Sequence, residues 1–176
     1  MSWIIGLAIG AAVAVIAYLV GRRFLANRGA RLVECPETRQ PAAVDVAATK
    51  LAMGGRLELS DCSRWPERAS CGRECLQQIE RSPDGCLVRT MVTNWYHDKS
   101  CGVCGKPVGH IDWLERQPAL MDQAGVARPW QEVAPETLPA VLSTHTPVCF
   151  DCYVAETFRR EHPELVLDNP WRRVGN

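Results

Sequence analysis

The chain has 176 residues, which is room for one compact domain with a short appendage rather than for two full domains. Its 20 lysine and arginine side chains balance its 20 aspartate and glutamate side chains. This balance argues against a nucleic-acid surface, because binding to phosphates requires a basic excess that displaces counterions.

The first predicted element is an apolar helix over residues 3–20, which contain no charge and no proline. At a rise of ~1.5 Å per residue this helix is roughly 27 Å long, close to the thickness of a bilayer's hydrocarbon core. Only Met1 and Ser2 precede it, whereas a cleaved signal peptide carries positive charge ahead of its apolar stretch. We therefore expect residues 1–25 to be a retained transmembrane anchor.

The basic residues next to this run predict its orientation. They are Arg22, Arg23, Arg28 and Arg31. Positive charge that flanks a span favours the cytoplasmic side, so we expect a single-pass membrane protein whose soluble part is cytoplasmic. With the opposite orientation the soluble part would face an oxidising space, where its cysteines could pair as disulfides.

Within the apolar run, Gly6 and Gly10 form a small-xxx-small pair. Such a pair lets a second transmembrane helix approach closely. Single-span helices are rich in small residues in any case, so ordinary packing against lipid is the alternative to helix pairing.

Beyond the anchor the pattern predicts an α+β fold of short strands and three or four helices. A polar tether is expected over 26–34, followed by a cysteine-containing α+β subregion over 35–98. The elements expected there are strands at 43–47 and 56–60, a helix over 71–80, and an amphipathic helix capped by Ser82 that runs through Trp95. Residues 99–176 form the second expected region, with a strand over 108–114, a hairpin over 119–130, a proline-bounded piece over 136–142 and a helix over 151–162.

The strongest chemical signal is Cys101-Gly-Val-Cys104, which is matched further along the chain by Cys149-Phe-Asp-Cys152. Zinc takes four soft ligands in a tetrahedron, and two thiolates separated by two residues can bind one ion from a single turn. Gly105 permits the positive φ that turns backbone N–H groups toward the sulfurs. The second pair leads into a predicted helix, whose N-terminal dipole favours thiolates. We therefore expect one structural zinc site, with two separate redox dithiols as the alternative.

This arrangement over residues 99–162 resembles the treble-clef group of zinc fingers and, more loosely, the zinc ribbons. The resemblance implies metal binding and a local treble-clef-type fold, and it implies no biological role. Rubredoxins, which hold iron between two glycine-bearing knuckles, match less well because the second pair has no following glycine. His110 and His145 are near the two pairs in sequence and could replace a ligand, although the four thiolates suffice.

The chain has nine cysteines, and four of the remaining five are candidate ligands of a second metal site: Cys35, Cys62, Cys71 and Cys75. The last two would share one face of the predicted helix, and the first two would join from turns. Zinc or an iron–sulfur cluster would suit four such thiolates, and buried apolar thiols are the alternative. Cys86 is expected in the core.

Taken together, the patterns predict a membrane-anchored zinc protein that is not an enzyme and that serves as a docking or assembly module for a protein partner. No phosphate loop, nucleophile elbow or HExxH run occurs in the sequence, and no nucleic-acid or small-molecule substrate is indicated. The docking patch would use exposed aromatic side chains, with candidates Trp65, Trp113, Trp130 and Trp171.

Two alternatives remain open. The first is a membrane-tethered redox protein that uses an iron–sulfur cluster or a dithiol at Cys35, Cys62, Cys71 and Cys75. The second is a metal sensor or metal-delivery protein, which would need a site of modest affinity, whereas four thiolates usually bind zinc tightly.

Overall fold

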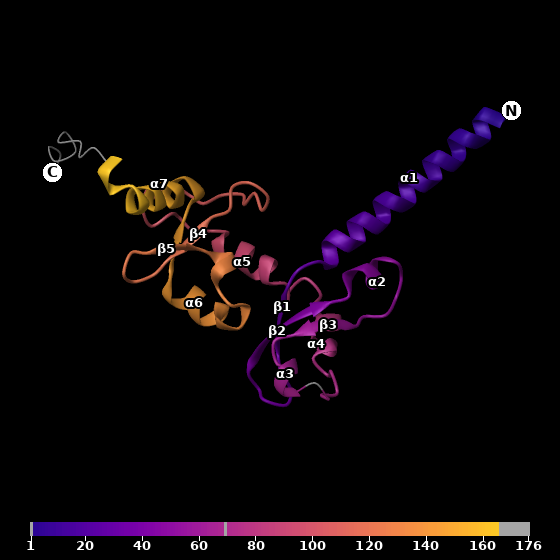
Figure 1. Cartoon of the computed structure of the whole chain (residues 1–176), viewed down its shortest axis with the longest axis horizontal. Helices are drawn as coiled ribbons and strands as arrows, with labels where there is room; N and C mark the ends of the chain where they lie inside the picture. Colours follow the sequence, from indigo (N-terminus) through magenta and orange to yellow (C-terminus); the bar gives the residue numbers. More distant parts are fainter. Residues whose placement is uncertain (1, 69, 166–176) are drawn as a thin grey trace. The chain divides into compact units, whose positions relative to one another are not determined.

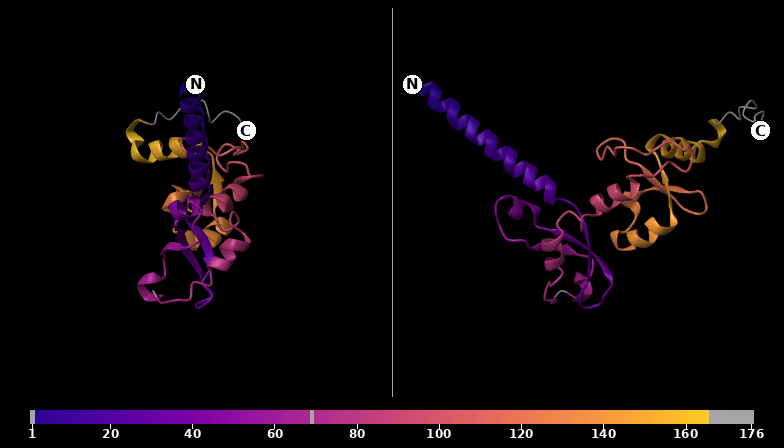
Figure 2. Two further views of the ribbon diagram at one scale, coloured as in Figure 1. Left: turned by 90° about the vertical axis from the view of Figure 1, so that its right-hand side faces the viewer. Right: turned by 180° about the vertical axis from the view of Figure 1, so that it is seen from behind.

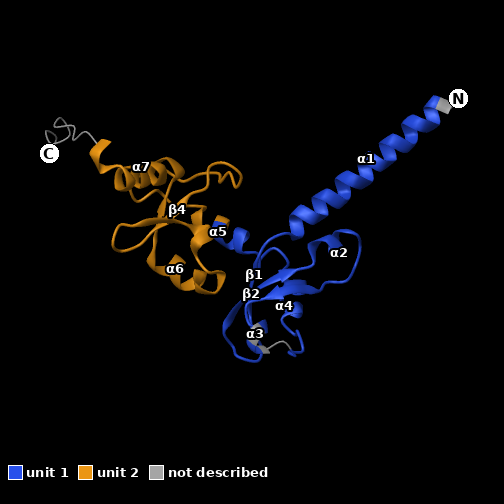
Figure 3. Cartoon of the chain, in the orientation of Figure 1, with its two compact units in different colours: residues 1–92 blue, residues 93–176 orange. Residues whose placement is uncertain are grey.

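The computed structural model describes residues 2–68 and 70–165. The chain divides into two compact units, residues 1–92 and 93–176 (Figure 3). The described residues form an α+β architecture with two small antiparallel sheets, one in each unit (Figure 1). Helices α2 to α7 follow the N-terminal helix, more than the three or four expected, because several of them are only one or two turns long.

Helix α1 spans Ser2–Asn27 and confirms the predicted apolar helix, although it continues beyond Val20 through Arg22 and Arg23. Its side chains over residues 3–19 are exposed, and Figure 2 shows it as one unbroken helix from two further directions. By length and composition, α1 could cross a membrane or act as a signal sequence, because both require a long apolar helix near the N-terminus.

The sheet of the first unit consists of β1 (Arg31–Glu34), β2 (Pro41–Val46) and β3 (Leu59–Cys62), in the order β1-β2-β3. Strand β2 confirms the predicted strand over 43–47, and alternate residues along it are buried. Strand β3 begins later than the strand predicted over 56–60. Strand β1 occupies part of the predicted tether, because pairing with β2 and burial of Val33 draw this polar stretch into the core.

The short helices of the first unit are α2 (Ala48–Ala52), α3 (Trp65–Arg68) and α4 (Leu76–Arg81). The helix predicted over 71–80 is wrong in its first part, because Arg73 adopts a positive φ of 54° and the helix begins only at Leu76. Cys71 and Cys75 therefore do not share a helix face. Helix α5 (Val88–Tyr96) confirms the predicted amphipathic helix, but residues 83–86 form a turn before it.

Arg31 is the one buried charged residue among the described part of the chain, with 1% of its surface exposed. Its guanidinium Nη1 donates to the backbone oxygens of Asn27, at 2.9 Å, and Gly29, at 3.3 Å. The first of these oxygens belongs to the last turn of α1, where backbone carbonyls have no partner within the helix. Arg31 thus joins the end of α1 to the first strand, and the basic residues that remain at the surface near the apolar stretch of α1 are Arg22, Arg23 and Arg28.

The sheet of the second unit consists of β4 (Ala119–Met121), β5 (Ala127–Pro129) and β6 (Thr146–Val148), in the order β5-β4-β6. Strands β4 and β5 confirm the predicted hairpin. Asp122 shapes its turn, since one carboxylate oxygen accepts the N–H groups of Ala124 and Val126, both at 2.9 Å. Strand β6 was not predicted, because three residues that include a proline carry no periodicity of their own.

The strand predicted over 108–114 is wrong. Gly109 has a positive φ of 69°, and Asp112 accepts the N–H groups of Leu114 and Glu115 through one carboxylate oxygen. These local bonds replace the ladder that a strand would require, so the segment is a loop.

Helices α6 (Leu138–Thr144) and α7 (Phe150–Glu161) complete the second unit, and α7 confirms the predicted C-terminal helix. Three single 3-10 turns lie at 130–132, 135–137 and 163–165. Two aromatic side chains of α5 bond to backbone oxygens in this unit: the hydroxyl of Tyr96 donates to Ala119 at 2.6 Å, and the indole of Trp95 donates to Leu142 at 2.8 Å.

Candidate metal centre

The first cysteine pair lies in a tight turn that closes on itself. The backbone N–H of Cys101 donates to the oxygen of Lys106, and the N–H of Gly105 donates to the oxygen of Cys101, both at 2.8 Å. Gly105 has a positive φ of 73°, a conformation that glycine adopts without steric cost. The turn aims the N–H groups of Val103 and Cys104 at the sulfur of Cys101. This is the knuckle geometry that the sequence predicted.

The second pair stands at the start of α7. Cys149 is the residue before the helix, with φ −69° and ψ 157°, and Cys152 lies in the first helical turn. Strand β6 carries the chain to this point, and β6 is fixed to the knuckle because the N–H of Gly102 donates to the oxygen of Pro147 at 2.8 Å. A second bond links the two pairs directly: the N–H of Cys149 donates to the sulfur of Cys101 at 3.3 Å.

These connections bring four sulfurs together. The Sγ atoms of Cys101, Cys104, Cys149 and Cys152 all lie within 4.8 Å of one another, and those of Cys104 and Cys149 are 3.8 Å apart. With Zn–S bonds of about 2.3 Å, a tetrahedral zinc site places its sulfurs about 3.8 Å apart. The cluster therefore has the size and the donor set of a four-thiolate metal site.

Burial differs across the cluster. Cys101 is only 2% exposed and packs with Ala119 and Val148 in the core of the second unit, whereas Cys104 is at the surface. The site therefore forms one wall of the core and has one edge open to solvent. A metal here would hold the knuckle, β6 and α7 together, which is the role of a structural ion in a small domain.

The thiols of the cluster have unequal pKa values. Burial opposes ionisation of Cys101, but the N–H groups of Cys149, Cys104 and Val103 stabilise its thiolate and bring its pKa down to about 6. Burial raises the pKa of Cys149 and of Cys152, and the neighbouring thiols raise that of Cys152 further. The thiolate of Cys101 thus forms readily, while a bound cation would favour the ionised forms of Cys149 and Cys152.

The two histidines near the pairs do not belong to this group. In the described part of the chain, the group of close metal-binding side chains consists of the four cysteines alone. The imidazole Nδ1 of His145 lies 2.9 Å from the hydroxyl of Thr144, and His110 lines a hollow that Cys149 and Phe150 also line.

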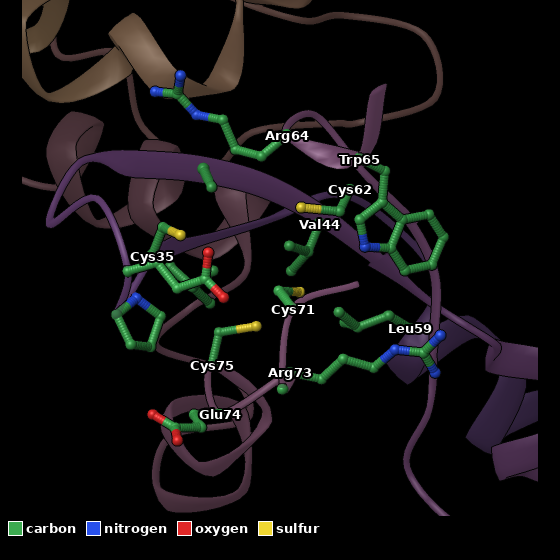
Figure 4. Close-up of a pocket in the computed structure, with 15 residues that line it drawn as sticks. Cys35, Val44, Leu59, Cys62, Arg64, Trp65, Cys71, Arg73, Glu74 and Cys75 are labelled. Atoms are coloured by element: carbon green, nitrogen blue, oxygen red, sulfur yellow. The ribbon is translucent and has the colours of Figure 1, made fainter. Parts of the chain in front are cut away.

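The four cysteines proposed for a second site lie in the first unit, and all four line one cavity there: Cys35, Cys62, Cys71 and Cys75 (Figure 4). Their sulfurs do not form a group as close as the cluster of the second unit. Cys86 lies apart from them, with its sulfur 3.7 Å from the oxygen of Gln78. All nine cysteines are free thiols in the structure.

Comparison with protein-family models, with curated proteins and with solved structures found no match in any of the three.

Proposed function

We propose that this chain is a membrane-anchored zinc protein whose four-cysteine site is structural and whose soluble part is a non-enzymatic docking or assembly module on the cytoplasmic face. One observation carries the proposal, namely the four sulfurs within 4.8 Å of one another. Four thiolates fill the tetrahedral shell of zinc and leave no position for a reactive water, which is typical of structural sites.

A local treble-clef-type finger is the fold that best accounts for the site. It is supported by a glycine-bearing knuckle at Cys101, by the hairpin that follows it, and by a second pair at the start of α7. Metal analysis of the purified full-length protein in detergent tests this reading. We expect the wild type to contain zinc. The Cys101→Ser/Cys104→Ser double variant should lose the zinc of the four-cysteine cluster, and the Cys86→Ser control should retain it. Retention of all zinc in the double variant would refute it.

Membrane anchoring is supported by the length and the exposed apolar surface of α1. The intact mass of the protein extracted from membranes distinguishes an anchor from a signal sequence. We expect a mass that includes α1, whereas a mass that begins after α1 would show cleavage.

The cytoplasmic orientation is supported by the surface charges at Arg22, Arg23 and Arg28. Met53 is 69% exposed in the first unit, so a Met53→Cys variant offers a reporter thiol. In sealed cells, a thiol reagent that cannot cross membranes should label this variant no more strongly than the wild type. Once the membrane is permeabilised, the reagent should label the variant more strongly. Equally strong extra labelling of sealed cells would place the soluble part outside.

A docking surface in the second unit is supported by the loop between Asp112 and Arg116. Leu114 at its tip is 93% exposed, next to an edge-to-face pair of Trp113 and Trp130 whose ring centroids are 5.0 Å apart. Trp65 belongs to the first unit, and Trp171 lies outside the described residues. Trp is enriched among the residues that carry binding energy at protein interfaces, and Leu114 would extend the apolar contact beside this tryptophan pair.

Native electrophoresis of the solubilised protein tests this docking surface. We expect the wild type to migrate in a complex larger than one chain, and Leu114→Glu to reduce the complex while zinc content stays unchanged. Met53→Glu is the matched control, because it adds the same charge at another exposed apolar position. A complex that persists in Leu114→Glu would exclude this loop as the contact. Helix pairing through Gly6 and Gly10 stays a separate prediction.

The redox alternative has one supporting observation, the four thiols around a single cavity in the first unit. Visible absorbance of the purified protein separates the two functions, since zinc thiolates are colourless and iron–sulfur clusters absorb strongly.

A further inference from the structure

A second set of thiols converges on one cavity in the first unit. The cavity has a volume of about 140 Å³, and Cys35, Cys62, Cys71 and Cys75 all line it. Figure 4 shows their sulfurs directed toward the same space, although the four residues come from three separate segments of the chain. Those segments are the turn after β1, the end of β3 and the loop before α4.

The turn at Cys35 has an unusual backbone. The N–H of Cys35 donates to the oxygen of Gln40 at 2.9 Å, and the N–H of Arg39 donates to the oxygen of Cys35 at 2.7 Å. Arg39 has a positive φ of 52°. The Thr38 hydroxyl, and after it the backbone N–H groups of Thr38 and Glu37, lower the pKa of the Cys35 thiol.

This turn repeats the hydrogen-bond frame of the knuckle at Cys101. In both turns the cysteine N–H donates to the oxygen five residues later, and the residue four positions later donates back to the cysteine oxygen. Arg39 occupies the place of Gly105, with the same sign of φ. A left-handed conformation is unfavourable for a residue with a side chain, so the surrounding structure must hold this turn in place. Thr38 stands where the knuckle has its second cysteine, Cys104.

The loop before α4 supplies two further thiols. Arg73, between Cys71 and Cys75, has a positive φ of 54°, and this reversal lets both sulfurs face the cavity from one loop. Cys75 is the residue that precedes helix α4. The first unit thus has a knuckle-like turn followed later by a cysteine at a helix start, which is the chain order found in the second unit.

The thiols around the cavity would concentrate negative charge if all of them were ionised. Burial raises the pKa of Cys75, and the nearby thiols of Cys62, Cys71 and Cys35 raise it further. A divalent cation removes this mutual repulsion but leaves a net charge of about −2 on four thiolates. Two arginines and two glutamates also line the cavity, so these side chains together add no net charge to it: Arg64, Arg73, Glu37 and Glu74.

Both arginines are held in place beside the cavity. The guanidinium of Arg73 lies 5.4 Å from the ring centre of Trp65, and that of Arg64 donates to the side-chain oxygen of Gln40 at 2.8 Å. Their positions therefore belong to the folded unit, and they supply positive charge where thiolates would concentrate negative charge.

We propose that Cys35, Cys62, Cys71 and Cys75 form a second four-thiolate site that binds one zinc ion. The site does not depend on the cluster of the second unit or on the docking role. Binding requires the four sulfurs to converge from the walls of the cavity, and the thiol protons pass to solvent as the thiolates coordinate the ion. The second ion would stabilise the first unit, whose sheet has only three short strands.

The test is metal stoichiometry of the full-length protein in detergent, prepared under reducing conditions without oxygen. We expect two zinc ions per chain in the wild type and in the Cys86→Ser control. We expect one zinc ion per chain in the Cys35→Ser/Cys71→Ser double variant, and one in the Cys101→Ser/Cys104→Ser double variant. One zinc per chain in the wild type, lost only with the Cys101 pair, would overturn the second site and leave the proposed function intact. One zinc per chain in the wild type, lost only in the Cys35→Ser/Cys71→Ser double variant, would support the second site and overturn the proposed function.

Two further measurements keep the test decisive if a variant fails to fold. Cobalt titration of the metal-free wild type should reach two equivalents with the intense sulfur-to-cobalt absorption of tetrathiolate sites, whereas saturation at one equivalent contradicts the proposal. If the purified protein contains iron, and its visible absorption disappears in the Cys35→Ser/Cys71→Ser double variant, the site holds an iron–sulfur cluster. That result would overturn the assignment of zinc.

Discussion

The backbone N–H of Cys149 donates to the sulfur of Cys101 at 3.3 Å, so the start of α7 and the knuckle are joined even before a metal is considered. A hydrogen bond from an amide to a thiolate sulfur both fixes the position of the sulfur and favours its ionised form. Each half of the site therefore helps to prepare the other for metal binding.

Removal of the metal should unfold the second unit. Structural zinc contributes about 10–16 kcal/mol in small zinc-finger peptides, and Cys101 packs in the core of this unit. We expect a strong chelator to abolish the near-UV circular dichroism of the buried Tyr96 and its neighbours, and added zinc to restore it. A spectrum that is unchanged after verified metal removal would show that the unit folds without the ion.

Gly105→Ala should destabilise the second unit by about 1–2 kcal/mol, because its φ of 73° is strained for any residue with a side chain. An added methyl group meets open space there, so the cost is one of backbone conformation alone. Arg39→Gly is the converse change in the first unit, and we expect it to leave stability unchanged or to raise it by up to about 1 kcal/mol. Urea denaturation of each variant measures both effects, and a destabilised Arg39→Gly would contradict the strain argument.

Gly102→Ala should destabilise the second unit for a different reason. A Cβ at this position collides with the Cγ2 methyl of Thr146 on β6, which the N–H of Gly102 holds close through its bond to Pro147. Thr146→Ser removes that methyl group, so the double variant should recover most of the stability that Gly102→Ala loses. Additive losses in the double variant, measured by thermal denaturation, would show that the collision is not the cause.

Tyr96→Phe should cost about 1–3 kcal/mol, because the hydroxyl is buried and its removal leaves the oxygen of Ala119 without this donor. Tyr18→Phe is the matched control, since that side chain is exposed on α1. Denaturation curves of the two variants should differ clearly. Equal stabilities would indicate that a water molecule replaces the lost hydroxyl at Ala119.

Arg31→Met should destabilise the junction between α1 and the first strand by about 1–3 kcal/mol. It removes the donor to the oxygens of Asn27 and Gly29 at a site that is almost completely buried. Arg28→Met removes the same charge from an exposed position and should have little effect. Hydrogen exchange of the amides from Asn27 to Arg31 should accelerate in the first variant only, and equal protection in both would contradict the proposed role.

Several features could be predicted because they depend on local rules. The apolar helix follows from length and composition, and the hairpin over 119–130 follows from turn residues between two short apolar runs. The proximity of Cys101 and Cys104 is likewise a property of one tight turn. The glycine after them indicates that this turn needs a residue with a positive φ.

Other features could not be predicted because partners distant in the sequence create them. Strands β1 and β6 have weak patterns, and each is a strand because a neighbour pairs with it. The segment 108–114 is a loop and not the expected strand, because the Asp112 carboxylate accepts hydrogen bonds from nearby N–H groups. The hydrophobic periodicity of the sequence does not indicate such bonds. The knuckle-like turn at Cys35 was missed because an arginine, Arg39, holds a conformation that sequence reasoning assigns to glycine.

The sequence by itself determined the N-terminal apolar helix, the α+β class and the two cysteine pairs as a candidate metal site, because each is encoded in residues a few positions apart. Only the tertiary structure decided that Cys35, Cys62, Cys71 and Cys75 line one cavity and that Arg31 is buried. The physical reason is that side-chain convergence depends on where separate segments meet, and a conformation that is unfavourable locally persists only when packing around it compensates the cost.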